Sequence, residues 1–264
     1  MQAWRCAPED SGQVQLPSSP RGYCTLCKIC VHPNQLHISA KKHMDACAFS
    51  YCEALKSITL PNSLSVIPES AFSGCGALTS LVIPDGVTEL QKDAVSGCSS
   101  LVSVTIGKGV QRIGVGSFSS SPALKSVHIS DVQQWCRINF ERQDANPLYN
   151  RDAVLYINGE VVRDIVVPYV SSYAFFRCEE LKSVTFTEGT TTIWDSAFNE
   201  SGLETVIIPV TVTSIVRHAF EDLSQYVTIV YNGTREQWNA ITKASGWGAV
   251  VISYVRCTDG NVAP

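Results

Sequence analysis

Close to its start the chain carries side chains that could bind a metal ion. Thiolate and imidazole are ligands that zinc favours in structural sites, and four such residues stand close together: Cys24, Cys27, Cys30 and His32. A typical site pairs two short knuckles across a longer loop, but the later candidates, His37, His43 and Cys47, lack the spacing of a second knuckle. Two interpretations therefore stay open: a zinc-binding N-terminal module scaffolded by the rest of the chain, or an irregular cap with reduced or disulfide-paired cysteines.

The rest of the chain, which would position such a module, is dominated by an internal repeat. Each repeat begins with a small residue followed by an apolar, usually aromatic one, and successive pairs are 23, 23, 23, 57, 23 and 22 residues apart. A fixed period in the twenties is typical of a solenoid, in which each unit buries its apolar face by stacking on its neighbours. The pairs are Ala48-Phe49, Ala71-Phe72, Ala94-Val95, Ser117-Phe118, Ala174-Phe175, Ala197-Phe198 and Ala219-Phe220.

Each repeat also contains the pattern of a short strand. A leucine such as Leu55 is followed by alternating apolar positions in the string L-x-x-[ILV]-x-[LIF]. This alternation predicts a strand with one buried face. Proline ends several of these strands, as at Pro61 and Pro84, and a second apolar pair such as Leu64 and Ile67 follows. Each coil should therefore contribute two short apolar segments and one small–aromatic corner.

The full pattern, A-F-x-x-C-x-x-L-x-x-[IV]-x-[IL]-P-x-x-[VL]-x-x-I, resembles the BspA-like leucine-rich repeats of bacterial and protist surface proteins. The resemblance covers most of the chain. It implies a right-handed solenoid that is secreted or displayed on the cell surface and that recognises or adheres to other molecules without catalysis. The chain departs from the pattern where Ser121 and Ser201 replace the cysteine and where one residue is missing before Leu203. Pro168–Ala174 is also four residues shorter than Pro61–Ala71, so we expect a locally irregular coil there.

These features predict one leucine-rich-repeat solenoid, β-rich and of the α/β class, with about seven coils of ~23 residues. Residues 1–46 are expected to form a Cys/His-containing tail and cap, and residues 47–264 the solenoid. Two segments depart from regular coils: a helix–hairpin interruption at residues 131–165 and a C-terminal helical cap at residues 231–264.

Two similar stretches, D-V-Q-Q-W-C-R-I and T-R-E-Q-W-N-A-I, predict a short helix in each departure. Asp131 is a favourable N-cap, and Thr234 with Gln237 has the spacing of a capping box. In each stretch a tryptophan, Trp135 or Trp238, shares a helical face with an isoleucine. That arrangement favours packing onto the solenoid, although a tryptophan pair also suits a carbohydrate platform.

The remaining parts of the two departures predict strands. Val154–Val162 alternates around Asn158-Gly159, which is typical of a hairpin with a type I′ turn. Val250–Ile252 predicts a last strand, and we expect the tail that ends at Pro264 to be mobile.

The exposed strand positions form the candidate binding surface. They carry hydroxyl and β-branched side chains with almost no charge, and they should form two rows with one coil per step. Such a surface suits a protein, extracellular-matrix or glycan partner held by many weak contacts, although the same residue types also satisfy strand propensity alone. The candidate residues are Ser57, Thr59, Ser80, Val82, Ser103, Thr105, Ser126, His128, Ser183 and Thr185, and the rows continue to Thr205 and Ile207.

The chain has eleven cysteines, and four of them occupy one repeat position that serine fills elsewhere: Cys52, Cys75, Cys98 and Cys178. Exchange with serine indicates a small side chain at a tight turn, so we expect a ladder of buried free thiols. A disulfide between Cys136 and Cys257, each near an insertion or a terminus, stays open.

Composition limits the remaining classes of function. A net charge of −4 without a basic stripe argues against nucleic acid, and no 18-residue apolar run predicts a transmembrane helix. No paired carboxylates, nucleophile–base set or phosphate loop occurs at corresponding strand ends, so we expect no enzyme. The first ten residues lack the apolar core of a secretory signal, which leaves a cytoplasmic location open beside the surface location that the resemblance implies.

Overall fold

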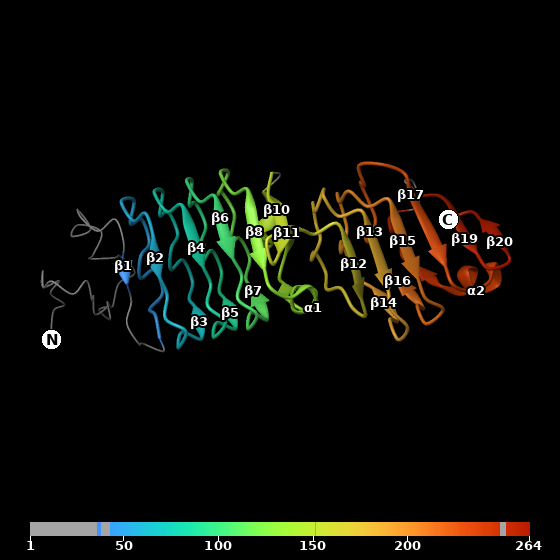
Figure 1. Ribbon diagram of the computed structural model, residues 1–264, viewed down its shortest axis with the longest axis horizontal. Helices are drawn as coiled ribbons and strands as arrows, with labels where there is room; N and C mark the ends of the chain where they lie inside the picture. The colour runs from blue at the N-terminus through green and yellow to red at the C-terminus, as the bar shows by residue number, and fades with distance from the viewer. Residues whose placement is uncertain (1–35, 38–42, 151, 249–251) are drawn as a thin grey trace, which may run out of the picture. The chain divides into compact units, whose positions relative to one another are not determined.

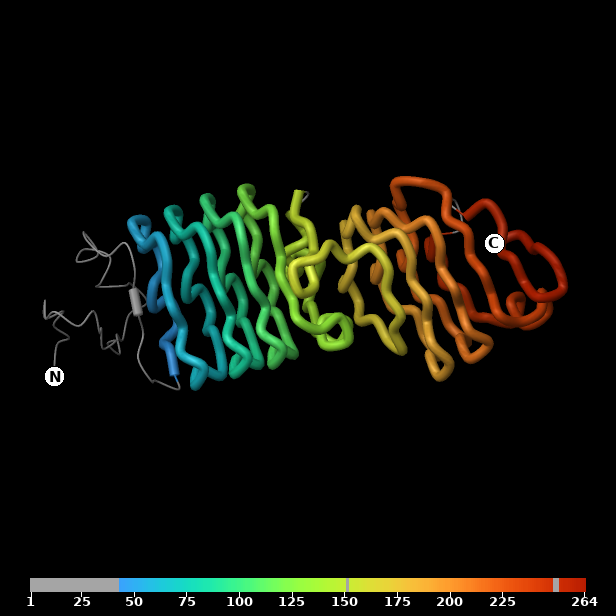
Figure 2. The backbone as a smooth tube through the Cα atoms, in the orientation of Figure 1, coloured from blue at the N-terminus to red at the C-terminus, as the bar shows by residue number. Residues whose placement is uncertain are grey.

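The computed structural model describes residues 36–37, 43–150, 152–248 and 252–264. The chain divides into two compact units, of which unit 1 comprises residues 1–130 and 141–153 and unit 2 comprises residues 131–140 and 154–264. Each unit is a stack of coils built from short strands with little helix (Figures 1 and 2). The solenoid architecture predicted from the repeat is therefore observed in both units.

Unit 1 contains two main parallel sheets. In its first sheet β4, β6 and β8 pair in parallel, and β1 and β2 form a separate two-stranded parallel sheet earlier in the chain. In its second sheet β3, β5 and β7 pair in parallel. The strands are β1 (Leu36–His37), β2 (Ile58–Thr59), β3 (Val66–Ile67), β4 (Ser80–Val82), β5 (Glu89–Leu90), β6 (Ser103–Thr105), β7 (Arg112–Ile113) and β8 (Ser126–Ile129), and the 3-10 turns η2 (Gln143–Ala145) and η3 (Pro147–Tyr149) follow.

Unit 2 has the same two-sheet plan. Its first sheet runs β12-β13-β15-β17-β19 in parallel and ends with the antiparallel β20, and its second sheet runs β14-β16-β18. The elements are α1 (Val132–Trp135), β9 (Asn139–Phe140), β10 (Val154–Ile157), β11 (Glu160–Val161), β12 (Asp164–Val167), β13 (Ser183–Phe186), β14 (Thr192–Ile193), β15 (Thr205–Ile208), β16 (Ser214–Ile215), β17 (Val227–Tyr231), α2 (Arg235–Ala240), β18 (Thr242–Lys243), β19 (Ile252–Cys257) and β20 (Gly260–Val262).

The small–aromatic corner joins each coil to the next. The small residue leaves room for the neighbouring backbone, so that Phe49 N–H donates to the Ala71 carbonyl at 2.8 Å and Phe72 N–H to the Ala94 carbonyl at 2.8 Å. Two left-handed residues four positions apart, such as Ser70 (φ 54°) and Gly74 (φ 73°), turn the chain around each corner. The sequence pattern thus specifies a turn as well as a core residue.

The aromatic residues of successive corners stack on one another inside each unit. Phe49 and Phe72 are parallel in unit 1, with ring centroids 5.4 Å apart. In unit 2 Phe198 lies between Phe175 and Phe220, each at 5.6 Å. All five rings are fully buried, so each forms part of the continuous core that joins neighbouring coils.

The repeated cysteines form the predicted ladder of buried thiols. The Cys75 thiol donates to the Phe49 carbonyl at 3.1 Å, and the Cys98 thiol donates to the Phe72 carbonyl at 3.2 Å. No cysteine in the described part of the chain takes part in a disulfide. The disulfide that the sequence left open between Cys136 and Cys257 is not formed. The Cys136 carbonyl accepts from Ser171 N–H in the coil after β12, and β12 lies four strand steps, or ~19 Å, from β19, far beyond disulfide reach.

Ser201 occupies the cysteine position but makes no corresponding hydrogen bond. Its hydroxyl is fully buried and has no partner among the described residues, whereas the Ser121 hydroxyl donates to the Val95 carbonyl at 3.5 Å. An unpaired buried hydroxyl is costly, and the larger sulfur of cysteine reaches the preceding coil elsewhere in the ladder.

Ser201→Cys is therefore expected to raise the free energy of unfolding by about 1 kcal/mol. Urea unfolding of the full chain measures the change. Ser121→Cys is the matched control, for which we expect a smaller gain because its hydroxyl already has an acceptor. Equal gains at both positions would contradict this explanation.

The predicted interruption is confirmed in its helix, its hairpin and the irregular coil. Asp131 caps α1 by accepting from Gln133 N–H at 2.8 Å, and β10 and β11 form an antiparallel hairpin around Asn158-Gly159. The shortened coil after β12 has no second-sheet strand, and the segment that follows α1 packs there instead. The Ser171 hydroxyl donates to the Ile138 carbonyl at 2.7 Å, and the Trp135 indole donates to the Ala174 carbonyl at 2.9 Å.

The C-terminal cap follows the prediction in its helix but not in its tail. Thr234 and Gln237 form the expected capping box at the start of α2. The expectation of a mobile tail is wrong for Gly260–Val262, which forms β20 and pairs with β19. β20 pairs with β19 in the antiparallel direction and so covers the edge on which the parallel strand of a further coil would otherwise pair.

Candidate functional site

In unit 1 the predicted binding residues form two straight rows on the first sheet. Strand register places Ser80 beside Ser103 and Ser103 beside Ser126. The second row runs along Val82, Thr105 and His128 in the same way. Ser57 and Thr59 flank the buried Ile58 in the preceding coil. The alternating sequence pattern thus brought these side chains to one face, as predicted.

In unit 2 the rows begin earlier and extend further than the sequence indicated. Ser183, Thr205 and Thr228 are paired neighbours in one row, and Thr185, Ile207 and Val230 in the other. The residues that sequence reasoning missed lie in β12, β17 and β19: Asp164, Val166, Thr228, Val230, Tyr254 and Arg256. The alternation of buried-type and exposed-type residues in V-T-I-V-Y (residues 227–231) could have predicted β17 from the sequence. A register shift between β17 and β19 places Tyr254 rather than Ser253 beside Thr228, and no local pattern predicts such a shift.

These faces combine hydroxyl groups with exposed branched side chains. Val82 is 57% exposed and Val166 is 60% exposed, whereas most of the serines and threonines in the two rows are half-buried. Among the row residues, charged side chains occur only at Asp164 on β12 and Arg256 on β19, apart from the imidazole of His128 in unit 1. The arrangement offers hydrogen bonds and small apolar contacts across several strands.

The second sheet of unit 1 has a different chemistry, because charged residues link its coils. The Arg112 guanidinium lies between the Glu89 and Glu141 carboxylates. The Val115 N–H donates to Glu141 at 3.0 Å, and this bond together with Arg112 lowers the pKa of Glu141. Exposed pairs of this kind contribute little to stability. The contrast leaves the two rows of the first sheet as the less charged surface, with the exposed Lys125–Asp152 pair directly before β8.

The buried thiols cannot serve as catalytic nucleophiles. Burial raises the pKa of Cys98 to about 12 and the pKa of Cys178 to about 12, and it also raises the pKa of Cys136. A nucleophilic cysteine needs a lowered pKa and access to substrate. These side chains therefore act as small core residues.

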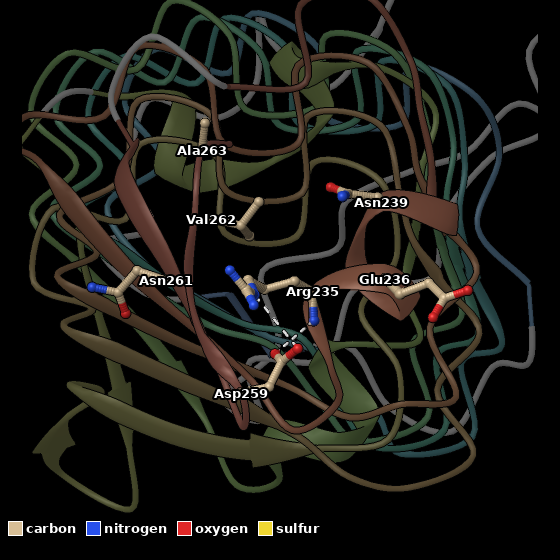
Figure 3. Close-up of a pocket in the computed structure, with 7 residues that line it drawn as sticks. All are labelled: Arg235, Glu236, Asn239, Asp259, Asn261, Val262 and Ala263. Carbon is tan, nitrogen blue, oxygen red and sulfur yellow. Dashed lines mark hydrogen bonds and ion pairs between the residues drawn. The ribbon is translucent and has the colours of Figure 1, made fainter.

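An open hollow of about 670 Å³ lies between α2 and the C-terminal segment (Figure 3). Arg235 and Asp259 face one another in it, and Arg235 N–H donates to the Asp259 carboxylate at 2.9 Å. Glu236 and Asn261 extend away from each other on opposite sides (Figure 3). Asp259 thus provides an acceptor for the backbone N–H of Arg235 at the start of α2. No nucleophile–base pair lies among the residues that line the hollow.

The predicted zinc ligands Cys24, Cys27, Cys30 and His32 lie outside the described residues, and zinc binding stays a prediction. Within residues 43–150, 152–248 and 252–264, no group of three or more His, Cys, Asp and Glu side chains is placed to hold a metal ion. The two helix tryptophans are core residues: Trp135 is 1% exposed and Trp238 is fully buried. Neither contributes a carbohydrate platform.

Comparison with protein families matches the repeat directly. A family model described as the BspA type leucine rich repeat region matches residues 28–145 and 161–242, in six copies. Together these ranges span well over half of the sequence. The chain belongs to this family. The predicted membership and the leucine-rich-repeat solenoid are thus confirmed.

Solved structures similar to this BspA-type chain include three bacterial proteins. A leucine-rich cell surface protein from Faecalibacterium prausnitzii is 19% identical over 87% of this chain and 89% of that one, with a TM-score of 0.36. A leucine-rich repeat protein of T. pallidum is 23% identical over 66% and 73%, with a TM-score of 0.36. One from Bacteroides ovatus is 17% identical over 80% and 83%, with a TM-score of 0.30. Scores this low add nothing to the family assignment. No curated protein matches the chain.

Membership of the BspA-type family indicates a role in binding or recognition, and leucine-rich-repeat proteins are typically non-enzymatic binding modules. Proteins with such repeats generally bind other proteins. No helix in the described part of this chain is long and apolar enough to cross a membrane.

Proposed function

We propose that this BspA-type chain is a non-enzymatic recognition or adhesion module, secreted or displayed at the cell surface. Its partner is a protein or extracellular-matrix surface, bound by the outward rows of a first sheet. The observation that carries the proposal is the pair of register-matched, nearly uncharged rows, Ser80–Ser103–Ser126 and Val82–Thr105–His128 in unit 1.

The physical argument is one of low desolvation cost. Hydroxyl and branched side chains can be covered by a partner without stripping water from charges, whereas the Glu89–Arg112–Glu141 ladder of the second sheet cannot. Because consecutive strands repeat every ~4.8 Å, the same contact recurs from coil to coil. Summed over several coils, weak contacts give useful affinity with little reorganisation, since the sheet is rigid.

The test places two lysines on this face. Ser103→Lys combined with Thr105→Lys is expected to weaken binding by at least about tenfold, because unpaired charges would be buried at the interface. Biolayer interferometry of the full chain against immobilised collagen, laminin and fibronectin measures the effect. Both native side chains lie on the partly exposed side of β6, so thermal unfolding should change little.

A matched control carries the same charge on the second sheet. Thr88→Lys with Gln111→Lys likewise adds two lysines, here one on each of two neighbouring coils, since Gln111 N–H donates to the Thr88 carbonyl at 2.8 Å. This control should retain binding. Equal affinity of the β6 double variant and the wild-type chain would overturn the proposed site.

A further inference from the structure

One exposed aromatic pair lies on the second sheet of unit 2, away from the rows proposed above. Trp194, directly after β14, is 40% exposed, and Tyr169, after β12, is 39% exposed. Their ring centroids are 6.5 Å apart at an interplanar angle of 62°. An edge-to-face contact leaves ring faces uncovered, and the exposed fractions show that part of both residues reaches solvent.

Trp194 stands apart from the other tryptophans that the structure describes. Trp135, Trp238 and Trp247 are all at most 6% exposed and pack inside unit 2. At the repeat position of Trp194 the other coils carry smaller residues: Pro68, Gln91, Gly114, Ser171 and Val216. The repeat therefore does not require an aromatic ring at this position, and 40% of Trp194 is exposed to solvent.

Hydrogen-bonded polar groups follow Trp194, at the next position in the chain and in the next coil. The Asp195 carboxylate accepts from the Ser196 hydroxyl at 2.8 Å and from Arg217 Nε at 3.0 Å. Its side chain is 20% exposed, whereas that of Arg217 is 66% exposed. Arg217 belongs to the next coil, because Val216 N–H donates to the Ile193 carbonyl at 2.9 Å. A planar acceptor and a planar donor thus lie next to Trp194 and carry no net charge together.

We propose that Tyr169, Trp194, Asp195 and Arg217, here named the Trp194 patch, bind a pyranose ring of a neutral glycan. The C–H groups on one face of a pyranose are weakly positive and pack against the negative face of an aromatic ring. Its hydroxyl groups donate to the Asp195 carboxylate and accept from the Arg217 guanidinium. Balanced charge favours a neutral sugar over an acidic one.

The size of the patch also favours a sugar over a protein. A stable protein interface buries about 800 Å² on each side, with a continuous apolar centre. Here two partly exposed rings adjoin the Asp195–Arg217 ion pair, and the neighbouring Thr192 and Ser214 of β14 and β16 are polar. Two rings with adjacent polar groups match the area of one or two sugar units.

Affinity gel electrophoresis of the full chain tests the proposal. Native gels contain barley β-glucan, xyloglucan, galactomannan or arabinogalactan, and a separate gel contains dextran sulfate as the acidic probe. At least one neutral polysaccharide should retard the wild-type chain. Trp194→Ala should weaken the apparent affinity by about tenfold or more, since stacking on an aromatic ring supplies much of the contact. Tyr226→Ala, at a residue 76% exposed elsewhere in unit 2, is the matched control and should migrate like wild type.

A second readout needs no variant. The bound neutral polysaccharide should protect the exposed indole from acrylamide quenching in the wild-type chain. Unchanged migration in every neutral gel would overturn the proposal, as would retardation that Trp194→Ala leaves intact. Retardation by dextran sulfate alone, lost in Arg217→Ala but not in Trp194→Ala, would also overturn it and indicate an acidic ligand. Because the patch lies on the second sheet, Trp194→Ala should leave binding by the first-sheet rows unchanged.

Discussion

Replacing Phe198 with alanine is expected to lower the free energy of unfolding of unit 2 by about 3–5 kcal/mol. Phe198 is fully buried at the centre of a three-ring column, 5.6 Å from Phe175 and 5.6 Å from Phe220. Phe186 adds an edge-on contact at 6.0 Å. Alanine would leave a cavity that the neighbouring rings cannot fill, because backbone hydrogen bonds between coils hold them in place.

Tryptophan fluorescence during urea unfolding measures this effect, because Trp135, Trp238 and Trp247 are buried in unit 2. The control is Tyr226→Ala, which removes a ring that is 76% exposed and should change stability by about 0.5 kcal/mol or less. A Phe198→Ala chain within about 1 kcal/mol of wild type would show that the aromatic column contributes little to the core.

Gly202→Ala is expected to cost about 3 kcal/mol although it adds only one methyl group. An added Cβ would lie 1.8 Å from the Glu179 carbonyl oxygen and 2.7 Å from its carbon. These are backbone atoms, so no side-chain rotation can relieve the overlap. The Gly202 N–H also donates to the Cys178 carbonyl at 3.1 Å, and separating the two coils would break this bond.

Gly76→Ala is the matched control for this variant. Its added Cβ would have the Ser99 hydroxyl as nearest neighbour, at 3.6 Å, which is an ordinary contact. We expect a change of about 1 kcal/mol or less in the same urea experiment. Similar losses for the two variants would mean that close approach of the coils is not what Gly202 provides.

Gly202 also explains how the fold tolerates the irregular repeat seen in the sequence. One residue is missing before Leu203, yet β15 regains the regular register, with Thr205 beside Ser183. The shortened connection instead runs against the backbone of the preceding coil, which only glycine allows at that distance. The same shortening accompanies the loss of a hydrogen-bond partner at Ser201.

The rows of the candidate site could be predicted from the sequence because alternation decides which side of a strand faces solvent. Ser103 and Thr105 flank the buried Val104 within one strand, and the fixed period repeats that choice in the next coil. The additions in unit 2 could not be predicted in the same way. Tyr254 and Arg256 join the rows only through the register shift between β17 and β19.

The sequence by itself determined the repeat, the two short strands of each coil, the thiol ladder and the caps of both helices. These features depend on residues within one coil or on its repetition, so short-range patterns specify them. The tertiary structure alone decided that Trp194 is exposed, that Gly260–Val262 pairs with β19, and that Cys136 and Cys257 stay apart. Each of these outcomes depends on which distant segments become neighbours, and a pattern of period ~23 carries no information about segments that depart from it.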